Sequence, residues 1–335
     1  MALEGEARPT GGEVASEFEL PRQATLAQNI WKFIRGKPLG AFGVLLVVFL
    51  VAMTLGTPQI TDWDVPNLPD RPFGFLLGDP WMSRYGVEDK FFTAENRLDI
   101  TASPSADHWF GTDGNGRDIW ARIVFGARRS MFISLWALAL ATVVGAAIGV
   151  ITGYYRGWLD TGVQRIMDAL QSFPPLIAII LIVTINPLSG IEPNLIVISA
   201  ALGIVGIPSV QRITRGVVLS TREQQYVEAA RVIGATDART MRYYILPNIF
   251  ASIIVVFSTG LGVAILAEAA LSFIVPDKVP QGASWGLMLN EASAALAGKF
   301  VWMGTFAAGA IAIAVLGFNL AGDALRDVLD PRLRI

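Results

Sequence analysis

Residues 131–153 read MFISLWALALATVVGAAIGVITG, an apolar run without a single charged side chain. A helix needs about 20 mostly apolar residues to cross a bilayer, and this run has that length. The rest of the chain has the same character, since 53% of its 335 residues are hydrophobic and only 16% are charged. Soluble domains are nearer to roughly a quarter charged, so the composition indicates a membrane protein.

Five further stretches resemble this run, some of them with polar interruptions. The six predicted spans are residues 39–58, 131–153, 172–188, 194–210, 248–275 and 302–320. Gly, Ala, Ser and Thr are frequent in the spans, and such small residues let helices approach closely in lipid. We therefore expect an all-α polytopic membrane protein in which six transmembrane helices pack as a bundle.

Lys and Arg in the short connections predict the orientation of the chain. They gather before the first span, between the second and third, between the fourth and fifth, and after the sixth. If the spans alternate, all these connections share one side, so both termini should face the cytoplasm (N-in, C-in). The expected divisions are a polar tail at 1–29, a first span with its basic flank at 30–58, an extracytoplasmic loop or cap at 59–130, a five-span core at 131–320 and a cytoplasmic tail at 321–335.

Residue types suited to catalysis are scarce in this sequence. There is no Cys and one His, His108, which excludes thiol catalysis and zinc–thiolate sites. Residues 112–118, TDGNGRD, have a spacing close to that of a calcium loop, but Arg117, Asp118 and Val124 fill positions where such a loop needs a ligand, a glycine and a glutamate. We expect instead a glycine-rich turn that caps a helix beginning near Asp118. Neither a metal site nor a catalytic residue is predicted.

One acidic residue, Glu268, falls inside a predicted span. Ionisable groups at bilayer depth are costly and usually face the bundle interior or a cavity. Glu268 is either a pathway or proton-relay residue, or a structural acid bonded to a neighbouring helix or subunit. The structural role is favoured, because the sequence offers no second intramembrane acid or base to complete a relay.

Residues 226–248, YVEAARVIGATDARTMRYYILPN, interrupt the apolar pattern and are called the polar segment below. Tyr226, Ala230 and Ile233 recur at helical spacing and predict one modest apolar stripe. A stripe this small suits a protein partner better than burial among lipid headgroups. The segment is therefore predicted to lie on the cytoplasmic surface and to dock on another protein.

Turn signals divide the polar segment into two helices. Gly234 stands where a helix end favours a left-handed residue. Thr236 or Asp237 can cap a second helix, and Pro247 suits the first turn of the fifth span.

The polar segment resembles the EAA loop of ABC importer permeases, whose pattern is E-A-A-x-x-x-G-x9-I-x-L-P. The matching residues are Glu228, Ala229, Ala230, Gly234, Leu246 and Pro247, and Tyr244 stands where the general pattern has Ile. Three other segments are similar to the C-type subunit of the dipeptide, oligopeptide and nickel importers, namely residues 110–130, 267–289 and 319–334. The resemblance therefore covers about residues 110 to 334.

This resemblance implies a type I importer in the prokaryotic plasma membrane. The chain would be one of two homologous permease subunits, working with two ABC ATPase subunits or a fused pair and with an extracytoplasmic solute-binding protein. The coupling loop at 212–247 would seat a helix at about 222–234 on one ATPase, with Glu228 near a basic contact. ATP and Mg would be held by the ATPases, and this chain would bind no cofactor.

The resemblance points to di- and oligopeptides as substrates, with nickel, glutathione or an oligosaccharide as alternatives. A secondary transporter or channel is the alternative from another class. That class predicts paired intramembrane charges or inverted repeats.

Overall fold

The computed structural model describes residues 34–55, 85, 89–92, 98, 100, 102–185, 194–280, 282–294 and 301–329. The chain divides into two units after Pro38, and the contacts given below lie within the unit from Leu39 to Ile335. The predicted tail at 1–29 and most of the predicted loop at 59–109 lie outside the described residues. Within the described ranges there is no strand beyond three isolated bridges.

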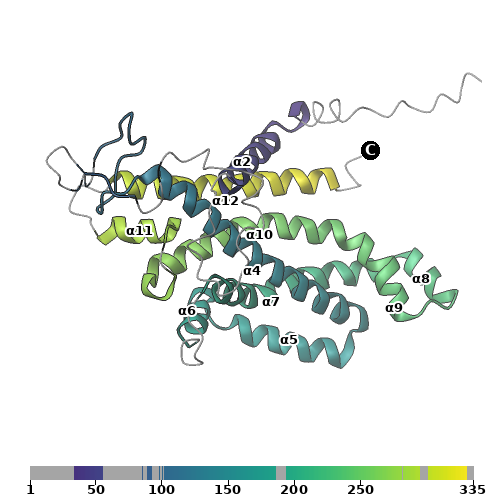
Figure 1. The fold of residues 1–335 in the computed structure, drawn as a ribbon. Helices are drawn as coiled ribbons and strands as arrows, with labels where there is room; N and C mark the ends of the chain where they lie inside the picture. Colours follow the sequence, from purple (N-terminus) through teal and green to yellow (C-terminus); the bar gives the residue numbers. More distant parts are fainter. Residues whose placement is uncertain are drawn as a thin grey trace, which may run out of the picture. The chain divides into compact units, whose positions relative to one another are not determined.

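Helices follow one another along the described chain (Figure 1). The long ones are α2 (Pro38–Leu55), α4 (Ile119–Tyr155), α7 (Leu195–Arg222), α10 (Leu246–Ile274) and α12 (Val301–Leu329). The shorter ones are α5 (Gly157–Gln171), α6 (Pro175–Ile185), α8 (Gln225–Val232), α9 (Asp237–Arg239), the π-helix η3 (Thr240–Ile245), the 3-10 helix η4 (Pro276–Lys278) and α11 (Trp285–Ala294). Among the described residues, five helices are long and apolar enough to cross a membrane, or six if the bent pair of α5 and α6 is one span. The predicted all-α polytopic architecture is confirmed.

The second span begins at Ile119, earlier than predicted. The Asp118 carboxylate caps α4 by accepting a hydrogen bond from the Ala121 N–H at 2.8 Å, which confirms the predicted cap. Residues 119–130, which were predicted to belong to the segment 59–130, are therefore the first turns of α4. Charged residues are accommodated in the first turns of α4 because acidic partners lie beside them, as Glu291 lies beside Arg122.

The predicted third span at 172–188 contains one helix, α6, which begins three residues later than predicted. It follows α5, and the two helices meet at an angle of 84°. Pro174 and Pro175 lack the N–H that a continuing helix would use, and a residue that precedes proline disfavours helical geometry. The chain therefore breaks directly after α5, and residues 186–188 lie outside the described part.

Two other predicted boundaries fall inside helices. The fourth span does not end at residue 210 but continues through Pro208 to Arg222, so the start of the predicted coupling loop at 212–247 is helical. The sixth span continues to Leu329, past the boundary predicted between the core and the tail at 321–335. No proline interrupts α12 before Pro331, which allows the helix to run beyond its apolar part.

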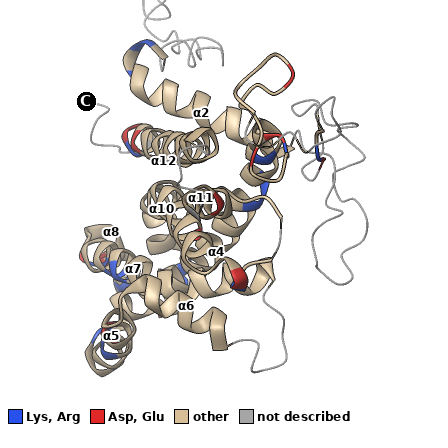
Figure 2. Ribbon diagram, turned by 90° about the vertical axis from the view of Figure 1, so that its left-hand side faces the viewer, with Lys and Arg blue, Asp and Glu red and all other residues tan. Residues whose placement is uncertain are grey.

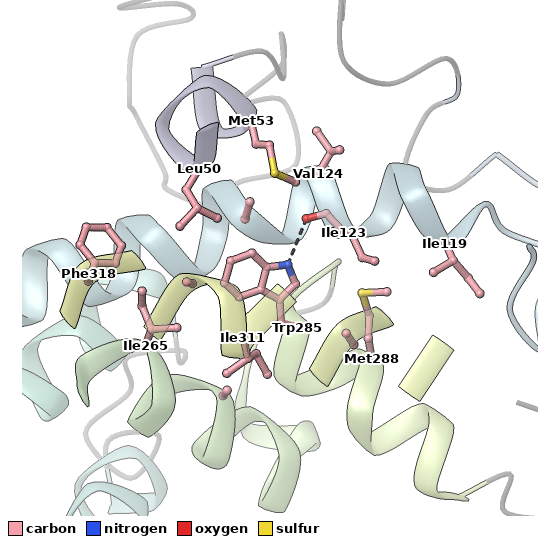
Figure 3. Packing of buried hydrophobic residues seen from close by; sticks show 14 of the residues in the cluster. Leu50, Met53, Ile119, Ile123, Val124, Ile265, Trp285, Met288, Ile311 and Phe318 are labelled. Carbon is pink, nitrogen blue, oxygen red and sulfur yellow. Dashed lines mark hydrogen bonds between the residues drawn. The ribbon is translucent and has the colours of Figure 1, made fainter. Parts of the chain in front are cut away.

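The largest core cluster surrounds Trp285 of α11 (Figure 3). Trp285 is fully buried, and its indole N–H donates to the Ile123 carbonyl of α4 at 3.0 Å. Side chains from α2, α10 and α12 complete the cluster, for example Leu50, Ile265 and Phe318. The short helix α11 is thus packed among the membrane helices and has a polar anchor at its centre.

The bundle has two distinct ends (Figure 1). At the α8 end, the carboxyl ends of α4 and α7 meet, since Arg156 pairs with Glu223 at 2.7 Å. At the α11 end, the amino end of α4 meets α11 through the pair of Arg122 and Glu291. Each end therefore gathers chain segments that are far apart in the sequence.

Candidate functional site

The polar segment is a helix, a reversal and a second helix, as predicted. α8 ends at Val232, and Gly234 has φ +84°, the left-handed geometry predicted for it. The Ala235 N–H donates to the Ala230 carbonyl at 3.0 Å and the Gly234 N–H to the Arg231 carbonyl at 2.9 Å. This pair of bonds is a Schellman motif, which satisfies the last carbonyls of the helix.

The two candidates for the second cap have different roles. Thr236 is the N-cap of α9, and its hydroxyl accepts from the Arg239 N–H at 3.4 Å. The Asp237 carboxylate accepts from the Tyr154 hydroxyl at 2.6 Å. Asp237 therefore joins the polar segment to the end of α4.

Pro247 lies at the start of α10, as predicted, but the chain before it is already helical. The π-helix η3 leads directly into α10, and the Leu246 N–H donates to the Met241 carbonyl. The Asn248 side-chain amide donates to the Tyr244 carbonyl at 2.7 Å. A widened turn and a side-chain donor thus accommodate a proline, which would otherwise interrupt the helix.

The inner face of α8 is formed by Val227 and Ala230, both buried. They face a small cluster that includes Val218, Ile245 and Ile249 from α7, η3 and α10. Of the predicted stripe, Ala230 faces the bundle, whereas Tyr226 and Ile233 are exposed. The i, i+3 spacing of Val227 and Ala230 is the sequence signal that could have identified the inner face.

The other residues that match the EAA pattern point outward. Glu228, Ala229, Gly234, Leu246 and Pro247 are all exposed. The turn after α8 also presents two large apolar side chains, since Val232 is 81% exposed and Ile233 is 79% exposed. An open hollow follows along the second helix, lined by Ala238, Arg239, Arg242, Tyr243 and Tyr244.

Tyr154, at the end of α4, contacts the polar segment, and no local sequence pattern indicates this role. Besides its bond to Asp237, its ring lies 5.1 Å from the Arg231 guanidinium and 5.6 Å from that of Arg222. Arg222 also donates to the Tyr154 carbonyl. Lys and Arg positions, which are blue on the ribbon of Figure 2, occur on α5, α7 and α8. The segment is therefore tied to both α4 and α7.

Glu268 lies between α10 and α4 and is fully buried. Its Oε1 accepts from the Ser272 hydroxyl at 2.8 Å. Arg129 of α4 is also buried and interacts electrostatically with Glu268. The expectation that no intramembrane base accompanies this acid was wrong, because α4 begins early enough to include Arg129.

A second charged cluster lies at the α11 end. Arg122 donates to Asp113 at 2.5 Å and to Glu291 at 2.5 and 2.9 Å, and Arg117 Nε donates to Asp113 at 2.8 Å. Burial alone raises the pKa of Asp113, but the Arg122 charge and the bonds from Arg117 and Asn115 outweigh it, so the pKa lies below its usual value of 3.8. Asp113 is therefore held ionised as the centre of a link between the 112–118 turn, α4 and α11.

Multiple apolar helices with a small helical segment at one end define the chain as a polytopic membrane protein. A family described as "Binding-protein-dependent transport system inner membrane component" matches residues 145–335. Two relatives are the dipeptide transport system permease protein DppC of Alkalihalophilus pseudofirmus, 40% identical over 71% of this chain and 76% of the relative, and the glutathione transport system permease protein GsiD of Pectobacterium atrosepticum, 38% identical over 72% and 80%. The chain belongs to this family of binding-protein-dependent transport components.

Family membership establishes the class of the protein and its location. The chain is a multi-pass permease subunit of an ABC importer in the plasma membrane, and it is a transport component rather than an enzyme. The system to which it belongs depends on a solute-binding protein.

Proposed function

We propose that this chain forms half of the translocation pathway of an ATP-driven peptide importer and that α8 docks on an ABC ATPase. The observation that carries the docking proposal is the form of α8 and its turn. One face of α8 is fixed to the bundle by Val227 and Ala230, while Glu228, Val232 and Ile233 point outward. Large apolar side chains exposed on a polar surface helix favour a protein partner.

Connections from α8 to the bundle give a route for mechanical coupling. Short turns join α8 to α7 on one side and to the continuous helix that becomes α10 on the other. Tyr154 adds α4 to the same body through Asp237 and Arg231. Closure of the ATPases would therefore displace the ends of three membrane helices together, as alternating access requires of a two-state element.

The complete transporter would contain a homologous second permease subunit and two ATPases, either separate or fused. ATP and Mg would bind to the ATPases, since the sequence of this chain contains no G-x-x-x-x-G-K-[ST] phosphate-binding loop. The solute-binding protein would dock at the α11 end. Family membership favours this assembly over a secondary transporter or channel.

Peptides are the proposed substrate class, because relatives are named for dipeptide and for glutathione transport. Glutathione is itself a modified tripeptide, so the two names share one chemistry. Nickel and oligosaccharides remain alternatives that a binding assay on the solute-binding protein would separate.

Two substitutions test the docking proposal, Glu228→Lys and Gly234→Val. The first reverses an exposed charge. The second places a Cβ at φ +84°, where nothing lies within 4 Å, so the strain of about 1 kcal/mol is conformational rather than steric. We expect both to reduce copurification of the ATPases and ATP-driven dipeptide uptake in proteoliposomes.

Two variants serve as matched controls. Asp323→Lys reverses a charge at an exposed position of α12, and Gly309→Val adds a side chain where a Cβ meets open space. These should assemble and transport like the unmodified chain. Wild-type assembly and uptake in both α8 variants would show that the proposed docking surface is wrong.

A further inference from the structure

Helix α5 is attached to α7 through a row of polar contacts. Arg215 of α7 donates to both carboxylate oxygens of Asp160, from Nε at 2.6 Å and from Nη2 at 2.5 Å. The other two contacts join Arg212 to Asp168 at 3.0 Å and Gln171 to Ser209 at 3.4 Å. We call these three pairs the α5–α7 seam.

The pair of Asp160 and Arg215 dominates the seam. It is a two-bond fork between a guanidinium and a carboxylate, and the side chains are only 12% and 27% exposed. Arg212 and Asp168 are each about half exposed, and an exposed ion pair stabilises by only about 0–1 kcal/mol. Loss of Asp160 or Arg215 should therefore release α5 more than loss of any other seam residue.

Apolar packing within this chain covers only part of α5. Trp158, Ile166 and Leu170 are 86%, 60% and 48% exposed, whereas Met167 is buried and Leu159 and Val163 are half-buried. The polar bonds of the seam therefore add a directional attachment to a limited apolar contact.

The chain changes direction at both ends of α5. At its start, Arg156 has φ 57° and ψ −162°, and Gly157 follows with φ 68°. Arg156 is the only positive-φ residue other than glycine in the described part of the chain, and such geometry costs on the order of 1–3 kcal/mol. At its end, the prolines at 174 and 175 produce the bend of 84° to α6.

The α6 helix belongs to a different contact group. Ile179 and Val183 pack in a cluster with Ile133 of α4 and Ile198 of α7, away from the α8 end. The seam, in contrast, lies on the second half of α7, from Ser209 to Arg215, and this half of the helix leads into α8. Because the chain bends at both ends of α5, contacts with α7 are needed to make α5 move together with α7.

We propose that Asp160 and Arg215 are positioning residues that make α5 follow α7 and α8, so that the force applied at α8 also reaches the α5–α6 bend. This inference rests on the proposed docking of α8. It adds α5 to the coupling path as an element that the EAA pattern does not contain. The bond between Asp160 and Arg215 would thus determine the amount of substrate transported per ATP hydrolysed.

The test measures uptake per ATP hydrolysed in proteoliposomes that contain the chain with its partner permease, ATPases and binding protein. The probes are alanyl-alanine and glutathione. We expect Asp160→Asn and Arg215→Gln each to lower the ratio about fivefold or more, the lower end of coupling between two sites. ATPase copurification and thermal stability should stay near wild type, and the exchange Asp160→Arg with Arg215→Asp should restore the ratio in part.

Arg165→Gln is the control, since it removes a charge from the exposed face of α5 without touching the seam. An unchanged ratio in both seam variants, with normal assembly, would overturn the inference alone. Failure of the unmodified chain to bind the ATPases would instead overturn the proposed function.

A second experiment does not depend on removing the pair. The chain has no Cys, so Gln171→Cys with Ser209→Cys introduces a unique thiol pair across the seam. A short bifunctional thiol reagent should then fix α5 to α7 and leave uptake per ATP unchanged, because the two helices already move together. Loss of uptake on cross-linking would show that α5 must move relative to α7, contrary to the inference.

Discussion

At the scale of single residues, Glu268 shows how a membrane interior holds a charge. Its carboxylate is fully buried, bonded to Ser272 one turn away, and it interacts with the Arg129 guanidinium on the neighbouring helix. A buried ion pair is weak evidence for stability, but breaking one by removing a single partner is costly. We propose that Glu268 is the structural acid that joins α10 to α4.

Glu268→Ala should destabilise the detergent-solubilised chain by about 3–5 kcal/mol, because it removes the carboxylate that interacts with the buried Arg129 guanidinium. The double variant Glu268→Gln with Arg129→Gln removes both charges and should recover most of that loss. Thermal unfolding followed by circular dichroism measures both. A pathway or proton-relay role predicts instead that Glu268→Ala unfolds like the unmodified chain, and that neither it nor the double variant transports.

At the scale of elements, the contact between α4 and α7 is made by glycines. Gly145, Gly149 and Gly153 recur at every fourth residue of α4, and a Cβ on any of them would lie 2.8–3.1 Å from atoms of α7. Small residues at this spacing allow two helix backbones to approach closely, which favours association in lipid. The abundance of small residues in residues 137–149 thus has a specific packing role.

Gly149→Ala should lower the unfolding temperature, because its Cβ would lie 2.8 Å from the Gln211 carbonyl, and overpacking costs about 1–3 kcal/mol. Gly216→Ala on α7 is the matched control, since no atom lies within 4 Å of its Cβ. Alanine there should leave stability unchanged or raise it by about 0.5–1 kcal/mol. Equal effects of the two substitutions would contradict close packing between α4 and α7.

At the scale of the whole molecule, the two ends of the bundle differ in charge. At the α8 end, basic residues outnumber acidic ones along the second half of α7 and the polar segment; among them are Arg222, Arg231, Arg239 and Arg242. At the α11 end, Arg117 and Arg122 are instead neutralised by Asp113 and Glu291. This asymmetry favours the predicted orientation, with the α8 end in the cytoplasm.

Single cysteines test the orientation, since the native chain has none. Trp109→Cys at the α11 end and Ile233→Cys at the α8 end replace side chains that are 60% and 79% exposed. A membrane-impermeant maleimide should label the first in intact spheroplasts and the second only after the membrane is disrupted. The opposite labelling pattern would show that the α11 end faces the cytoplasm. The unmodified chain, which has no Cys, measures the background labelling.

The sequence by itself determined the membrane class, the approximate spans and the helix–reversal–helix of the polar segment. These depend on local properties, such as apolar runs, the glycine at 234 and the caps at Asp118 and Thr236. The sequence also indicated the family, because the residues of the EAA pattern lie within one short segment of the chain. Span ends were less accurate, since charged turns extend α4 and α7 only where partners such as Glu291 and Asp160 lie opposite them.

Tertiary structure alone decided which side chains meet. Nothing near Tyr154 indicates that it binds Asp237, and nothing near Asp160 indicates Arg215, because each pair joins residues far apart in the sequence. The same holds for Arg129 and Glu268, which pattern analysis placed in a loop and in a span. Periodicity shows that a face is apolar or polar, but the packing of helices in three dimensions determines which residues form the opposite side of each contact.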